Sequence, residues 1–118
     1  MIKNTKILEE SVLQAIDAVA EQSGDRITKI IADLFKSSIL KRYKEAYDKE
    51  VIHGKVHREN VEKAIDFCFA DACASFRLLP GFADEQKEIE IRAAKSQIGV
   101  IKQTSLNFLV SKNIQIIQ

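Results

Sequence analysis

Two pairs of glutamates are the residues of this chain whose type and spacing could best support chemistry. Glu59 and Glu62 are three residues apart, and so are Glu85 and Glu88. On a helix this spacing places both carboxylates of a pair on one face, about one turn apart. Two such pairs on facing helices can hold Mg²⁺ and activate water for attack on a phosphate. These four glutamates are therefore the candidate metal ligands of a small Mg²⁺-dependent nucleotide hydrolase or of a ligand-binding helical bundle.

The order of the two pairs resembles the signature of the all-α nucleotide pyrophosphatases, E-x-x-E followed by E-x-x-D. The resemblance covers these four positions, and Glu88 stands where that family has Asp. The helix dipole also favours acidic residues in first turns. If each pair opens one helix of an antiparallel hairpin, a helix of about 20 residues separates the pairs by about 30 Å. We therefore assign no catalytic residue, metal ligand or cofactor, favour a non-enzymatic role, and keep the hydrolase as the alternative.

The histidines and cysteines offer less for catalysis. His53 and His57 have the i, i+4 spacing of helical metal ligands, but Gly54 between them indicates a loop, so we expect solvated histidines. Cys68 and Cys73 lie five residues apart in an apolar stretch, and on a helix they project in different directions. We expect both to be buried reduced thiols, which suits a reducing cytoplasm.

The elements that would position these residues are helices. The chain has only four glycines and one proline, and its apolar residues recur at three- and four-residue intervals. The pattern predicts an all-α fold, a four-helix, mostly antiparallel up-down bundle that forms one domain over residues 1–118. The expected helices cover about Thr5–Ser23, Asp25–Glu50, 59–79, and Asp84 onward.

The helix termini carry recognisable signals. Asn4 or Thr5, Asp25 and Asp84 are the expected caps of the first, second and fourth helices. Pro80 and Gly81 end the third. We expect a loop over 51–57, and leave open whether the tail at 113–118 is a last helical turn, a short strand or a frayed end.

The helix at about 59–79 should be the centre of the bundle. It is apolar around most of its circumference, so we expect neighbouring helices to cover it. Asp71 lies between Phe67, Ala74 and Leu78 on one side and apolar residues on the other. A carboxylate in such a place needs a partner, and we expect an ion pair with Arg92, Lys95 or a residue of the second helix. A polar contact inside an interface or a pocket is the alternative role for this buried polar residue.

Surplus apolar faces predict self-association. After Ser37–Ser38 the apolar residues of the second helix rotate by about 100–120°, which predicts either a kink or a second contact surface. The last helix has a seam at Ile91, Ala94, Ile98, Ile101, Ser105 and Phe108 and further apolar residues nearly opposite. We therefore expect a protein–protein interaction or regulatory module that forms a homodimer. The expected interface residues are Ile39, Leu40, Tyr43, Tyr47, Val100 and Phe108.

Charge and hydropathy limit the other partners. A net charge of +1 gives no general attraction for nucleic acid, although the last helix from Ile91 onward lacks acidic residues and could serve a nucleic-acid accessory protein. No apolar run approaches the length of a membrane span. The N-terminus has no apolar segment typical of a secretory signal. We expect a cytoplasmic protein with no membrane partner, in which an unidentified protein could be a further partner.

Overall fold

A computed structural model of the chain describes residues 4–23, 28–46 and 54–118. Within these residues the chain forms five helices and two short strands: α1 (Asn4–Ser23), α2 (Lys29–Ala46), β1 (Lys55–His57), α3 (Arg58–Arg77), α4 (Asp84–Lys95), α5 (Ile98–Ser111) and β2 (Gln115–Ile117). The all-α prediction is confirmed, and α3 matches the predicted central helix. In the described part of the chain no helix combines the length and the apolarity needed to cross a membrane.

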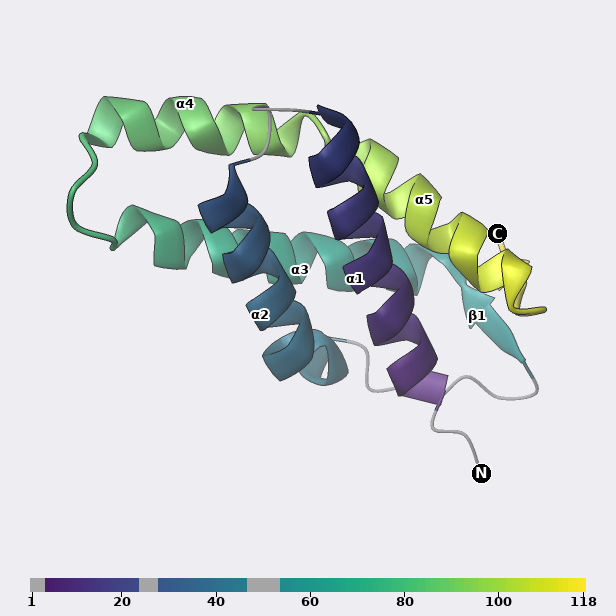
Figure 1. Cartoon of the computed structure of the whole chain (residues 1–118). Coiled ribbons are helices and arrows are strands. Elements are labelled where there is room, and N and C mark those ends of the chain that lie inside the picture. Colours follow the sequence, from purple (N-terminus) through teal and green to yellow (C-terminus); the bar gives the residue numbers. More distant parts are fainter. Residues whose placement is uncertain (1–3, 24–27, 47–53) are drawn as a thin grey trace.

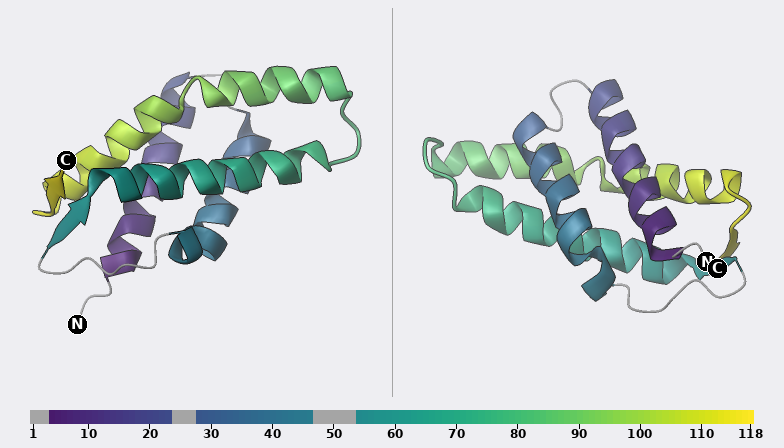
Figure 2. Two further views of the ribbon diagram at one scale, coloured as in Figure 1. Left: turned by 180° about the vertical axis from the view of Figure 1, so that it is seen from behind. Right: turned by 60° about the horizontal axis from the view of Figure 1, so that its bottom comes forward.

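The helices form two hairpins that cross each other (Figures 1 and 2). In one hairpin α1 and α2 run antiparallel; in the other α3 runs antiparallel to α4 and α5. The most extensive contacts join α2 to α3 and α1 to α5. The helices therefore do not follow one common axis. The first hairpin covers one side of the second, and the core lies between them.

The helix predicted from Asp84 onward is divided into α4 and α5. The hydroxyl of Ser96 donates to the carbonyl of Ala93 at 2.6 Å, and the backbone N–H of Gln97 donates to Ala94 at 3.0 Å. Such side-chain and i→i−3 bonds tighten the last turn and redirect the chain. As a result α4 lies along α3, while α5 turns towards α1 (Figure 1).

The two strands pair in parallel and join distant parts of the chain. Lys55 aligns with Gln115 and His57 with Ile117. The prediction of a loop at 51–57 is therefore wrong for β1, whereas the strand alternative for the tail is the observed one. Asn113, with φ of 64°, makes the left-handed turn that redirects the chain from α5 into β2.

The predicted cap of the fourth helix, Asp84, differs from the structure. Ala83, with an extended backbone, precedes α4, and Asp84 is its first residue. At the start of α2 the hydroxyl of Thr28 accepts a hydrogen bond from the N–H of Ile31 at 3.2 Å, which is a capping contact. Asp25, the expected cap, and Glu50, the expected end, lie outside the described residues.

Candidate functional site

The outer face of α3 carries a row of apolar residues that the other described residues leave exposed. The buried residues of α3 point towards the other helices: Val61, Ala64, Ile65, Cys68, Phe69, Ala72, Cys73 and Phe76. Phe67, Ala70, Ala74 and Leu78 are all exposed and define what we call the outer face. Phe67 is 42% exposed and Leu78 is 84% exposed. The expectation that neighbouring helices cover α3 on all sides is therefore wrong for this face.

The spacing of these four residues explains why they form one stripe. They follow each other at intervals of three, four and four, which keeps them on one side of a helix. From Phe67 to Leu78 the stripe extends about 16 Å along the axis. The hairpin of α1 and α2 lies on the other side of α3, so nothing in the described part of this chain packs on the stripe.

Asp71 lies at the edge of the outer face that is nearest to α2. Its carboxylate accepts a hydrogen bond from the hydroxyl of Ser38 at 2.8 Å and forms an ion pair with Arg42 at 3.3 Å. Its side chain is 30% exposed, so it is half-buried rather than fully buried. The charge partner is a residue of the second helix, while Arg92 and Lys95 are exposed on α4. Asp71 therefore joins α3 to α2 beside the outer face.

Two of the predicted interface residues are core residues instead. Ile39 and Tyr43 are fully buried within the chain. They are buried because α2 packs beside α1 and also crosses α3, and a helix with two neighbours needs a wide apolar sector. The rotation of the apolar pattern after Ser38 therefore serves this chain's own core, and α2 continues as one helix through the serine pair.

The other predicted interface residues are scattered. Leu40 is 63% exposed and Val100 is 50% exposed, and each has polar neighbours on its own helix face. Phe108 is partly buried against the core. Tyr47 lies outside the described residues. These positions do not form one surface on the described structure.

The sequence contained a signal for the outer face that our interface prediction missed. Phe67, Ala74 and Leu78 were recognised only as neighbours of Asp71. On the helix they form an apolar line on the side nearly opposite to the core line through Ile65 and Ala72. Two separate apolar lines on one helix indicate two packing surfaces.

The acidic pairs lie far apart, and each pair includes a glutamate that forms an ion pair with a basic residue. Glu59 and Glu62 are in the first turns of α3, whereas Glu85 and Glu88 begin α4 at the opposite end of α3 (Figure 1). Glu59 pairs with Lys63 at 2.8 Å, and Glu88 pairs with Arg77 at 2.9 Å. Hydrogen bonds from these basic groups lower the pKa of both carboxyls, Glu59 and Glu88. Within the described residues no three His, Cys, Asp or Glu side chains gather as a metal site would require.

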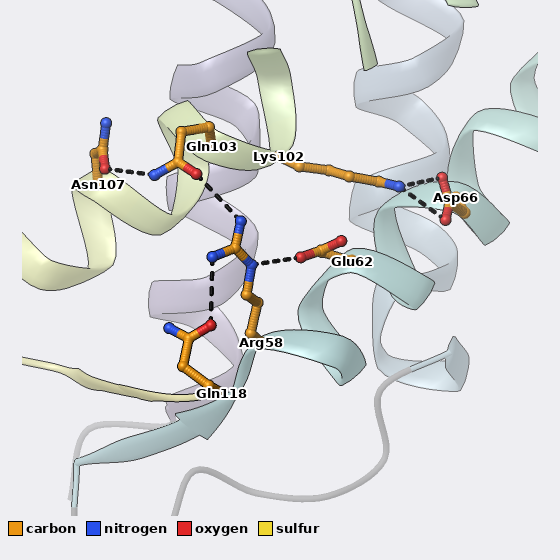
Figure 3. Close-up of polar contacts among 7 residues, drawn as sticks. All are labelled: Arg58, Glu62, Asp66, Lys102, Gln103, Asn107 and Gln118. Atoms are coloured by element: carbon orange, nitrogen blue, oxygen red, sulfur yellow. Dashed lines mark hydrogen bonds and ion pairs between the residues drawn. The ribbon is translucent and has the colours of Figure 1, made fainter. Parts of the chain in front are cut away.

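Arg58 binds a third predicted ligand, Glu62, in a structural cluster (Figure 3). Its guanidinium donates to Glu62 at 2.7 Å, to Gln118 at 3.3 Å and to Gln103 of α5 at 3.3 Å. Beside it, Lys102 of α5 donates to Asp66 of α3 at 2.9 Å (Figure 3). These contacts fasten α5 and the C-terminal strand to the start of α3. His57 belongs to β1 in the same region, and His53 lies outside the described residues.

A shallow hollow lies between α1 and α5. Its volume is about 200 Å³, and it is lined by Ile7, Glu10, Ser11, Gln14, Phe108 and Lys112. The hydroxyl of Ser11 donates to the carbonyl of Ile7 at 2.9 Å. Ligand pockets usually have about 300–1,000 Å³ and a mainly apolar lining. This hollow is smaller than a usual ligand pocket, so it gives less support to ligand binding than the outer face gives to assembly.

Comparison with protein-family models, with curated proteins and with solved structures found no match for this chain. Its function must therefore be inferred from its own geometry.

Proposed function

We propose that this chain is a non-enzymatic protein–protein interaction or regulatory module that acts as a homodimer. The observation that carries the proposal is the outer face of α3, where Phe67 and Leu78 flank two exposed alanines. An exposed, contiguous apolar stripe on a folded domain is typical of an interaction surface. A stripe of this shape suits packing against another helix.

The end of the α3–α4 hairpin extends the same apolar region. Leu78 is the first residue after α3, and Phe82 in the following turn is 39% exposed. The ring of Phe82 packs on the buried ring of Phe76 with centroids 5.7 Å apart, so the turn is held in place. A pre-organised apolar surface loses little conformational freedom when it binds, which favours this end of the molecule as part of an interface.

The cellular setting of the proposal is the cytoplasm. Cys68 and Cys73 are buried thiols in the core. Burial raises the pKa of the Cys73 thiol, which keeps it protonated and unreactive. Reduced cysteines in a core suit a reducing compartment.

Sedimentation equilibrium at micromolar concentration tests the proposal. We expect a mass twice that of the 13.3 kDa chain. A monomer that also binds no apolar dye would contradict it. Release of phosphate from nucleoside triphosphates that needs Mg²⁺ and is lost in Glu62→Gln or Glu88→Gln would contradict a non-enzymatic role. Salt-sensitive binding of nucleic acid would instead indicate the accessory function.

A further inference from the structure

We infer that two copies of the chain pair through the outer face of α3, with their α3 helices antiparallel about a two-fold axis near Ala70 and Ala74. The inference rests on the proposed self-association and specifies the surface, the orientation and the register of the dimer. It is supported by the order of residue sizes along the stripe and by the charges on its two edges.

The order of side-chain sizes along the outer face is self-complementary. Phe67 and Leu78 are the large residues at its ends, and Ala70 and Ala74 are the small residues between them. The point midway between Phe67 and Leu78 lies within one residue of the point midway between Ala70 and Ala74. A two-fold axis at this point places Phe67 of each copy against the partner's Leu78, as an isologous interface requires. The alanines then meet at the crossing, where small residues allow two helices to approach closely.

The charges on the edge nearest to α2 also match a second copy. Asp71 and Arg42 lie there as an ion pair, with side chains 30% and 49% exposed. An antiparallel two-fold brings the same edge of both copies together, and Asp71 is only one or two residues from the axis. Each carboxylate then lies near the partner's Arg42 as well as its own. The four alternating charges at the centre favour this register, since exclusion of water strengthens such pairs.

The opposite edge, towards α4, is complementary in the same register. Lys63 lies on that side of the outer face, about ten residues before the axis, and is exposed. At the same distance beyond the axis the partner presents the start of its α4, where Asp84 and Glu85 are exposed. The antiparallel register therefore places Lys63, which pairs with Glu59 of its own helix at 2.8 Å, opposite two further carboxylates at each end of the interface. In a parallel pairing, the α4 edge would instead meet the partner's α2 edge, and Lys63 would not face the partner's Asp84 and Glu85.

Charged substitutions test the surface. Ala74→Glu places a carboxylate at the centre of the proposed interface, and Ala74 is exposed in the single chain, so the fold should tolerate it. Val110→Glu is the matched control, because Val110 is 57% exposed on α5, away from the outer face. In sedimentation equilibrium we expect Ala74→Glu to weaken dimerisation at least about 100-fold, which is about 2.7 kcal/mol, and Val110→Glu to leave it unchanged.

The failures of the two proposals give different results. A wild-type monomer overturns the proposed self-association itself. A wild-type dimer that survives Ala74→Glu, or that is broken by Leu40→Glu or Val100→Glu instead, leaves self-association intact and overturns the outer face as its surface. Circular dichroism of each variant as a dilute sample shows whether the single chain is still folded.

Disulfide cross-linking tests the register. Equal amounts of Phe67→Cys and Leu78→Cys chains, one of them carrying a tag, are mixed and oxidised. We expect a covalent heterodimer, because the two positions face each other across the axis. Each variant alone should cross-link poorly, since its two cysteines would be about 16 Å apart along the helices. Efficient cross-linking of Phe67→Cys alone indicates parallel pairing and overturns the antiparallel register, as does a mixture that forms no heterodimer. The native cysteines are buried and serve as unreactive internal controls.

Discussion

Replacement of Asp71 by alanine should destabilise the fold mainly through its hydrogen bond with Ser38. The Ser38 residue is only 4% exposed, and its hydroxyl lies 2.8 Å from the carboxylate. A hydrogen bond of this kind to a charged group contributes about 1.5–3 kcal/mol. The ion pair with Arg42 is longer, at 3.3 Å, and both of its side chains contact water, so it should contribute about 0–1 kcal/mol. We therefore expect Asp71→Ala to cost about 2 kcal/mol and Arg42→Ala about 0.5 kcal/mol in the free energy of unfolding.

A double-mutant cycle separates these contributions. Urea unfolding of Asp71→Ala, Ser38→Ala and the double variant, followed by circular dichroism, should give a coupling free energy of about 1–2 kcal/mol. The corresponding cycle with Arg42→Ala should give less than about 1 kcal/mol. Measurements at a low and a high protein concentration identify any share of the change in unfolding free energy that comes from self-association, since only that share depends on protein concentration. A coupling near zero between Ser38 and Asp71, or a larger one with Arg42, would refute this order of the contributions.

Three further predictions concern the α3–α4 hairpin and the core thiols. The Nζ atom of Lys87 donates to the carbonyl of Arg77 at 2.7 Å, and Lys87 is 7% exposed. Lys87→Met keeps the buried stem but loses this bond, so urea unfolding should show a loss of about 1–2 kcal/mol; a more stable variant would contradict it. Arg77 lowers the pKa of Glu88 in the folded chain. The Glu88 carboxylate therefore stabilises the fold fully at pH values above its pKa in the unfolded chain, and this stabilisation is lost as the pH falls through its lower pKa in the folded chain. The melting temperature of Glu88→Gln should therefore fall less than that of the wild type between neutral pH and about pH 3, and equal falls would argue against this ion pair. Cys68 and Cys73 should react with a thiol reagent only in denaturant, and rapid labelling of the native protein would show that they are not buried.

The sequence predicted the elements well where each depends on local pattern. Periodic apolar residues and the Pro80–Gly81 turn predicted the central helix, which the structure shows as Arg58–Arg77. The break between α4 and α5 had no comparable signal, because the seam from Ile91 to Ile101 runs through it without interruption. The break depends on tertiary packing: α4 lies along α3, whereas α5 packs on α1.

The pairing of β1 with β2 could not be predicted from local sequence patterns either, because it depends on tertiary structure. Lys55 and Gln115 are neighbours in the sheet although 60 residues separate them in the chain. Three-residue strands are too short to show a period.

The error at Ile39 and Tyr43 also has a tertiary cause. The sequence correctly showed two apolar sectors on α2, but only the crossing of the hairpins reveals that α1 and α3 occupy both.

The arrangement of the two hairpins also explains why the outer face of α3 exists, since the first hairpin lies on the other side of α3 and crosses it. Hairpins that cross can cover only the part of each other that lies at the crossing, whereas helices along a common axis cover each other for their full length. The chain is accordingly elongated, with extents of 47 × 26 × 22 Å, and the end of the α3–α4 hairpin projects beyond α2 (Figures 1 and 2). Lys87, the Arg77–Glu88 pair and the packing of Phe82 on Phe76 hold this end together from within. None of these contacts covers Phe67, Ala74 or Leu78, so the chain stiffens the hairpin and leaves its apolar side exposed. We propose a second copy as the cover for this side, which the first hairpin, lying on the other side of α3, leaves exposed.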